Sequence, residues 1–206
     1  MNIVQDESLR DRKKSRRRDL LLELAGHMIA ANGLRSLKVR DVASAAGCSI
    51  GSIYNEFGDF DGLILTISRR TIRALAARLS DVSDADPVTQ LYGLADGYLS
   101  YATEHGNLLR ALFEHRMEDD KPFPDDLLEM VMHTFALMHA PLVRLLPDRD
   151  SVEIALLARV MFSAVHGIIS LGLEERLVAV PPDSLRLLVR HFVKTHLIGI
   201  GIVVPE

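Results

Sequence analysis

The sequence contains one cysteine and no tryptophan, and glycine and proline are sparse at 13 and 8 of 206 residues. A single thiol, Cys48, excludes an intramolecular disulfide and any metal site built from several thiolates. No uninterrupted run of about 18 apolar residues is present, so we expect no membrane-spanning helix. The first 20 residues are charged rather than apolar. We therefore expect no signal peptide, no membrane partner and a cytoplasmic location.

Motifs of common enzyme classes are also missing. The chain has no Gly-x-Ser-x-Gly elbow, no phosphate-binding loop, no dinucleotide fingerprint and no His-Glu-x-x-His pair. Its central histidines are His105, His115, His133 and His139. None of these histidines forms a His-x-x-x-His pair. Glu129 and His133 are one possible pair of ligands, and two ligands are too few for a metal site. We expect no enzyme, no metal and no other cofactor.

The net charge of −4 is distributed unevenly along the chain. Residues 1–80 carry 14 basic and 9 acidic residues, a net charge of +5, whereas residues 81–206 carry 10 and 19, a net charge of −9. The most basic stretch is RDRKKSRRR at residues 10–18, which is expected to form a solvated arm or the exposed first turn of a helix. A basic N-terminal part on an acidic body is typical of a protein that meets a polyanion at one end.

Apolar residues recur at helical spacing through most of the chain, and the breaks fall at glycine, proline or short polar stretches. The pattern predicts an all-α fold of about nine helices. These are expected near residues 19–32, 39–46, 50–57, 59–80, 87–105, 107–117, 125–146, 151–173 and 183–198. Ser49 and Asp59 stand where a side-chain oxygen can cap the helix that follows.

The segment from Val39 to Gly58 predicts a helix-turn-helix. It encodes two helices of about two turns joined by a short turn at Gly47, and the second helix of such a unit enters the major groove of DNA. Val42, Ala43 and Ala46 are small enough for a tight helix crossing. An ordinary helical hairpin within a core is the alternative interpretation of this segment alone.

Residues 16–63 resemble the DNA-binding domain of TetR/AcrR-family regulators. The resemblance rests on these elements in order: Asn32-Gly33, Arg40-Asp41-Val42-Ala43, Ala46-Gly47, Ser49, Gly51-Ser52-Ile53-Tyr54, Phe57-Gly58 and Leu63. It implies a homodimer that binds double-stranded operator DNA and is controlled by a small-molecule ligand, most often as a repressor. It implies a DNA-binding domain over residues 1–60 and a ligand-binding and dimerisation domain over residues 61–206.

The resemblance also implies which residues contact DNA. Ser49–Phe57 is then the recognition helix with its cap, and Tyr54 takes the place of a phosphate-contacting tyrosine. We predict contacts from Arg16, Lys38, Val39, Arg40, Ser49, Ile50, Gly51, Ser52, Tyr54 and Asn55. A flexible basic arm, with Arg12, Lys13, Lys14, Arg17 and Arg18 beside Arg16, can lie along phosphates or enter a minor groove.

Three positions depart from the family pattern. Lys38 stands where a threonine or serine is common, and Ile50 stands where a lysine is common. Asp59-Phe60-Asp61 replaces a frequent lysine in the first turn of the next helix. Lys38, Arg40 and the basic arm can restore the missing positive charge, and Ile50 can contact a thymine methyl group.

The acidic body is expected to hold the ligand pocket and the dimer interface. Candidate pocket residues are Phe113, Met117, Met130, Phe135, Met138 and His166, with ordinary core packing as the alternative for each. Candidate interface residues are Leu157, Met161, Val165, Ile168, Leu188 and Phe192, on two helices that are apolar on more than one side. The segment around His166-Gly167 resembles a Trp-His-Gly-type C-terminal domain, although this chain has no tryptophan.

An enzyme and a helical module that binds a membrane surface or a protein remain as alternatives to the DNA-binding regulator. Salt-dependent binding to a palindromic duplex separates the regulator from both.

Overall fold

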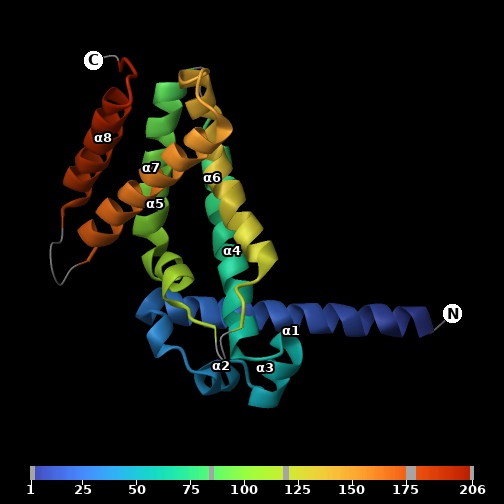
Figure 1. Ribbon diagram of the computed structural model, residues 1–206. Coiled ribbons are helices and arrows are strands. Elements are labelled where there is room, and N and C mark those ends of the chain that lie inside the picture. Colours follow the sequence, from blue (N-terminus) through green and yellow to red (C-terminus); the bar gives the residue numbers. More distant parts are fainter. Residues whose placement is uncertain (1–2, 84–85, 118–120, 175–179, 205–206) are drawn as a thin grey trace. The chain divides into compact units, whose positions relative to one another are not determined.

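The computed structural model describes residues 3–83, 86–117, 121–174 and 180–204, and within these residues every regular element is helical (Figure 1). The α-helices are α1 (Ile3–Asn32), α2 (Val39–Ala45), α3 (Ile50–Phe57), α4 (Phe60–Ser80), α5 (Pro87–Glu114), α6 (Asp125–Leu145), α7 (Ser151–Gly172) and α8 (Pro182–Gly199). A short 3-10 turn, Leu34–Ser36, separates α1 from α2. The all-α prediction is confirmed.

The described helices differ from the expected ones in number and in one start. The two helices expected on either side of His105 are joined as α5 across a kink at that residue (φ −128°, ψ 31°), so the predicted break is present but does not separate them. The structure therefore has eight α-helices in its described part instead of about nine. Helix α1 begins at Ile3, well before the expected start near residue 19, because residues 3–18 contain no glycine or proline and are rich in good helix formers.

The chain forms two compact units that interleave along the sequence. The first unit comprises Met1–Thr71 and His105–Leu127, and the second comprises Ile72–Glu104 and Leu128–Glu206. Helices α4, α5 and α6 each contribute residues to both units. The functional division at residue 60 stays a prediction.

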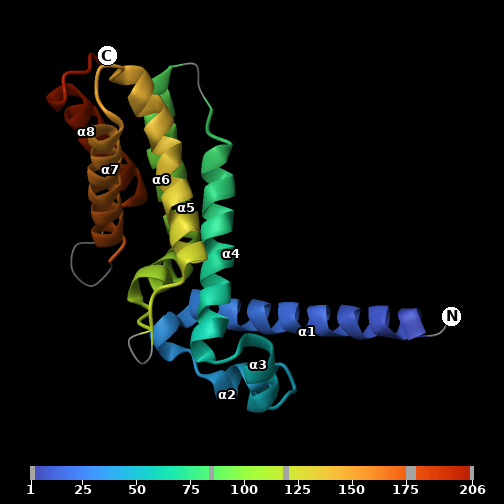
Figure 2. The same ribbon diagram turned by 45° about the vertical axis from the view of Figure 1, so that its right-hand side comes forward.

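The first unit is built on a three-helix core of α1, α2 and α3. In both ribbon views α2 and α3 lie on the same side of α1 (Figures 1 and 2). The side chains of Leu21, Ile29, Val42, Ile53 and Leu63 are fully buried in one cluster. Burial of a leucine or isoleucine side chain is worth about 1.5–3 kcal/mol, so this cluster holds the helix-turn-helix in place.

The second unit packs α7 and α8 closely. The side chains of Leu185, Val189 and Val193 on α8 are fully buried. On α7, Ile154 and Ile169 are each only 1% exposed. A Cβ atom at Gly172 would lie 2.5 Å from Cδ1 of Leu185, so a larger residue there would force the buried Leu185 side chain to shift. Asp150 caps α7 by accepting from the backbone N–H groups of Val152 and Glu153, both at 2.8 Å.

Candidate nucleic-acid interface and internal cavity

The helix-turn-helix has the geometry that its sequence predicts. Gly47, with φ +64°, lies in the turn between α2 and α3, in a conformation that glycine adopts most readily. Val42 and Ala43 are buried where α2 meets the core. The Ser49 hydroxyl accepts from the backbone N–H of Ser52 at 3.2 Å, which confirms the predicted cap of α3.

One side of α3 faces solvent and the other packs into the core. Gly51, Tyr54 and Asn55 are exposed, and Tyr54 has 39% of its surface accessible. Ile50 is half-buried against the core of the unit, so less of it is available to a thymine methyl group than expected. The exposed side carries a hydroxyl, an amide and a backbone without a side chain, which suit contacts to phosphates and base edges.

The start of α2 carries two exposed cations. Lys38 occupies the N-cap position with extended backbone, and its side chain makes no cap hydrogen bond. Lys38 and Arg40 are exposed, whereas Val39 packs partly against the core. The N-terminus of α2 and these two cations together favour an anion at this point.

The basic stretch is helical here, and it is not a flexible arm. Residues 12–18 belong to α1, and two of their cations are bound within the unit. Arg17 Nη2 lies 2.6 Å from Glu56 Oε1, and the Glu56 side chain is only 2% exposed. Arg18 donates to the backbone carbonyl of Glu56 and stacks over the Phe57 ring at 4.5 Å. These contacts hold the last turn of α3 against α1, and Arg12, Lys13, Lys14 and Arg16 stay exposed.

The two acids in place of the expected lysine are used inside the first unit. Asp59 Oδ1 accepts from the Gly62 backbone N–H at 2.7 Å, which confirms the predicted cap of α4, and its Oδ2 lies 3.0 Å from Lys121 Nζ. These two interactions lower the pKa of the Asp59 carboxyl, with the bond from Gly62 as the larger cause. Asp61 is 3% exposed, and its Oδ1 lies 3.1 Å from His115 Nε2. Both acids thus link the start of α4, directly after α3, to His115 and Lys121.

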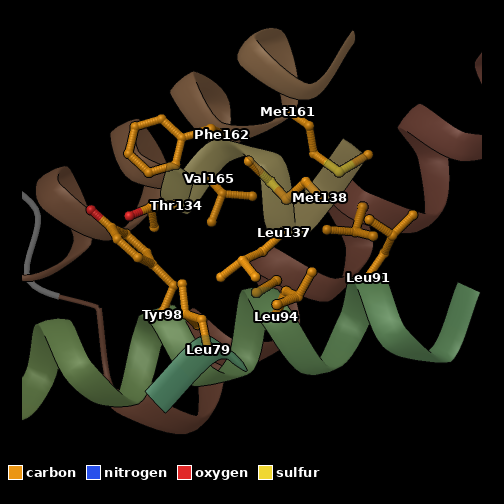
Figure 3. A pocket seen from close by; sticks show the side chains of 12 residues that line it. Leu79, Leu91, Leu94, Tyr98, Thr134, Leu137, Met138, Met161, Phe162 and Val165 are labelled. Carbon is orange, nitrogen blue, oxygen red and sulfur yellow. The ribbon is translucent and has the colours of Figure 1, made fainter. Parts of the chain in front are cut away.

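The second unit contains a small cavity with a free volume of about 30 Å³. It is lined by Leu79, Leu91, Leu94, Ala95, Tyr98, Thr134, Leu137, Met138, Met161, Phe162, Val165 and Val193. Figure 3 shows the Tyr98 and Thr134 hydroxyl groups at one end of this cavity and two methionines toward the other. No charged side chain lines it, so the cavity suits an apolar molecule.

A polar chain lies behind the Tyr98 end of the cavity. The Tyr98 hydroxyl is hydrogen-bonded to His166 Nδ1 at 2.7 Å, and Ser170 Oγ lies 3.2 Å from His166 Nε2. Phe162 stacks on the His166 ring with a centroid separation of 5.7 Å. Burial raises the pKa of Tyr98 and lowers the pKa of His166, so both side chains are uncharged at neutral pH.

The predicted pocket residues are divided between the two units. Met138 lines the cavity, His166 bonds to its Tyr98, and Phe135 packs edge-on against its Phe162 at 4.7 Å. Phe113 and Met117 belong to the first unit, and Phe113 is 48% exposed. Met130 is half-buried on α6 and is not one of the lining residues. Sequence reasoning missed Tyr98, although its place on the apolar stripe with Leu91 and Leu94 was a signal of burial.

The predicted interface residues separate into buried and accessible sets. Met161 and Val165 are 2% and 5% exposed and line the cavity, because they share the inward side of α7 with Ile154 and Ile169. Leu157, Ile168 and Phe192 are half-buried, and Leu188 is exposed. The apolar side chains that face solvent on these helices are Val152, Leu156, Val160 and Leu171 of α7 and Leu187, Leu188 and Ile198 of α8.

Helix α7 is also, among the described residues, the one helix whose length and composition would allow it to cross a membrane. It contains Glu153 and Arg159, so it has no uninterrupted apolar run of that length. Six of its 22 residues are buried within the unit. Its remaining apolar side chains form a surface that another chain can cover.

Two family models match the chain. The model described as bacterial regulatory proteins, tetR family, matches residues 21–67. The model described as tetracyclin repressor-like, C-terminal domain, matches residues 91–195, which is more than half of the 206 residues. The resemblance to a Trp-His-Gly-type C-terminal domain stays a prediction.

Curated relatives and solved structures agree with these models. The HTH-type transcriptional repressor KstR2 of Mycobacterium tuberculosis is 41% identical over 80 residues, 38% of this chain and 40% of that protein. The HTH-type transcriptional regulator BetI of Stenotrophomonas maltophilia is 32% identical over 98 residues, 46% of this chain and 50% of that protein. The matches thus span half or less of these relatives.

Similarity to solved structures extends over nearly the whole chain. The TetR family transcriptional regulator PfmR of Thermus thermophilus superposes with a TM-score of 0.65 at 19% identity, over 92% of this chain and 98% of that one. A protein of unknown function from Rhodococcus sp. RHA1 has a TM-score of 0.70 at 21% identity, over 86% and 93%. These similarities show a shared fold.

Proposed function

Because the chain belongs to the TetR family of bacterial transcriptional regulators, we propose that it is a homodimeric repressor whose operator affinity depends on a small apolar effector. Regulators of this family bind DNA and are not enzymes. The observation that carries the proposal is the capped helix α3 with its exposed side, in a helix-turn-helix whose other helix, α2, carries the exposed cations Lys38 and Arg40 at its start. KstR2, a relative named as a transcriptional repressor, is similar over 38% of this chain, which supports repression as the outcome of binding.

The proposed effector is uncharged and largely apolar, and its site is the cavity of the second unit. The lining has only two polar side chains, and both already have partners: Tyr98 bonds to His166, and Thr134 donates to the Met130 carbonyl at 3.0 Å. A charged group would lack a counter-ion there. A free volume of about 30 Å³ is far below the roughly 300–1,000 Å³ of ligand pockets, so an effector must displace lining side chains. Met138 and Met161 can adapt to such a change.

The proposed dimer interface uses the solvent-facing apolar side chains of α7 and α8. Val152 and Leu156 are 75% and 62% exposed, and Leu187 is 68% exposed. A two-fold axis beside these helices would bury the same surface on both subunits. In the DNA-competent dimer, the two recognition helices are expected about 34–36 Å apart, one turn of the double helix.

The decisive experiment is selection of a duplex from a random library, followed by fluorescence anisotropy with the selected sequence. A palindromic consensus with nanomolar and salt-dependent binding is expected. Tyr54→Phe removes only the exposed hydroxyl and should weaken binding equally across operator variants, because a phosphate contact carries no sequence information. An altered consensus in this variant, or no enrichment of any sequence by the wild-type protein, contradicts the proposal.

The effector proposal is tested separately by thermal shift with a panel of matched neutral, anionic and cationic amphiphiles. Neutral compounds should raise the melting temperature and change operator affinity. Tyr98→Phe, which keeps the ring and removes the bond to His166, should alter the ranking of neutral compounds that carry a hydroxyl. A response to the charged compounds alone refutes an apolar effector.

A further inference from the structure

A hollow of about 480 Å³ lies between the N-terminal half of α1 and the recognition helix within the first unit. Lys13, Lys14 and Arg17 line it from α1, and Asn55 and Glu56 line it from α3. Asn55 belongs at the same time to the exposed side of α3. The hollow therefore adjoins the surface that is proposed to read the operator.

The hollow carries an excess of positive charge. The one acid in its lining, Glu56, is neutralised by Arg17 at 2.6 Å and is almost completely buried. Lys13 and Lys14 are exposed, and in the described part of the chain neither ammonium group has an acidic partner. These two ammonium groups and the Asn55 amide thus surround an open space suited to an anion with several acceptor oxygens.

Helical geometry separates these lysines from the other basic residues of the same stretch. At 3.6 residues per turn, Lys13, Lys14 and Arg17 share the side of α1 that bears α3. Arg12 and Arg16 are one turn apart and lie around the helix from that side. The predicted contact at Arg16 therefore lies outside the hollow. Arg12 and Arg16 carry the same charge as Lys13 and Lys14, so they serve as a matched control pair.

We propose that this hollow seats a backbone phosphate of duplex DNA at the edge of the segment that α3 contacts, an inference that rests on the proposed operator binding. A DNA phosphate fits because it is held on a rigid duplex that α3 already positions, whereas a free anion would have only two solvated lysines to bind it. The helical state of residues 12–18 decides against minor-groove entry. A helix about 10–12 Å wide does not fit into a groove about 6 Å wide.

The test compares two double variants that remove equal charge, Lys13→Ala/Lys14→Ala and Arg12→Ala/Arg16→Ala. Operator affinity of each full-length variant is measured by anisotropy between 50 and 200 mM salt, on the duplex selected by the wild-type protein. Each phosphate contact contributes about 0.9 to the slope of log affinity against log salt. We expect the lysine variant to lose about 0.9 of slope per subunit, or about 1.8 per dimer, and the arginine variant to lose clearly less.

Ethylation interference gives a second and local readout. The wild type and the arginine variant should share one phosphate per half-site at which ethylation blocks binding, and the lysine variant should lose sensitivity there. All four side chains are exposed, so thermal unfolding of both variants should match the wild type. Equal slopes and identical interference patterns in the two variants overturn the phosphate seat and leave operator binding intact. Absence of any selected duplex for the wild-type protein overturns the proposed function and the seat together.

Discussion

Substitution of Arg18 by alanine tests whether the basic stretch holds the recognition helix in place. Arg18 donates to the Glu56 carbonyl in the last turn of α3 and stacks on the neighbouring Phe57. The carbonyl groups at a helix C-terminus lack partners within the helix, and a cation there also favours the helix dipole. Loss of Arg18 should therefore loosen the end of α3 without touching its exposed side.

The magnitude follows from these two contacts. A hydrogen bond from a charged donor contributes about 1.5–3 kcal/mol, and a cation–π contact at a partly exposed site about 0.5–1 kcal/mol. Water can replace part of the hydrogen bond, so we expect Arg18→Ala to lower the free energy of unfolding by about 2 kcal/mol. Operator affinity should also fall, by about tenfold for each 1.4 kcal/mol spent in reordering α3.

The assay is urea unfolding followed by far-UV circular dichroism at one fixed protein concentration, since dimer stability depends on concentration. Arg16→Ala is the matched control, because it removes the same charge from an exposed position on the same helix and should change stability by less than about 0.5 kcal/mol. Arg18→Met keeps much of the packing over Phe57 and should recover part of the loss. Equal losses in Arg18→Ala and Arg16→Ala would refute the role assigned to this contact.

Four further predictions concern the rest of the chain. Gly62→Ala should destabilise the first unit by more than about 3 kcal/mol in urea unfolding, because its Cβ would lie 1.9 Å from the Phe57 carbonyl oxygen; a wild-type midpoint argues against this geometry. Asp61→Asn should lower stability and operator affinity together, since it removes the buried partner of His115, and unchanged values of both would show that the pair is dispensable. Burial lowers the pKa of His166 in the folded state, so the unfolded state takes up a proton first as the pH falls below about 6.5. The free energy of unfolding should therefore decrease from pH 7 to pH 5.5, and it should decrease less steeply in the His166→Gln variant. Leu156→Glu should give a folded monomer in sedimentation velocity, and a persistent dimer would place the interface elsewhere.

Local sequence signals predicted the geometry of the helix-turn-helix well. The Ser49 and Asp59 caps and the turn at Gly47 all act within four residues of the backbone that they shape, so each is readable without knowledge of the fold. The departure from the family pattern at Asp59 and Asp61 was equally visible in the sequence. The sequence did not reveal what these two acids bind, because their partners His115 and Lys121 lie more than 50 residues away along the chain.

The roles of the individual basic residues at positions 10–18 could not be predicted from the sequence. The composition of this stretch alone allowed either a mobile arm or a helix, and it showed seven similar basic residues with no way to rank them. The folded structure gives these residues different roles. Arg17 and Arg18 are bound to α3, whereas Lys13 and Lys14 line the hollow beside Asn55. The acidic body behaves similarly: periodicity marked Met161 and Val165 as apolar positions of α7, and only packing placed them in the cavity.

The sequence by itself therefore determined the all-helical class, the helix-turn-helix at Val39–Phe57 and the asymmetry between a basic first part and an acidic body. These properties depend on spacing of three or four residues and on charge counts, which are local. Tertiary structure decided which cations remain free for DNA, which apolar side of α7 faces the cavity, and that Tyr98 stands at its polar end beside His166. Periodicity identifies the side of a helix that must be covered, but only the folded chain determines what covers it.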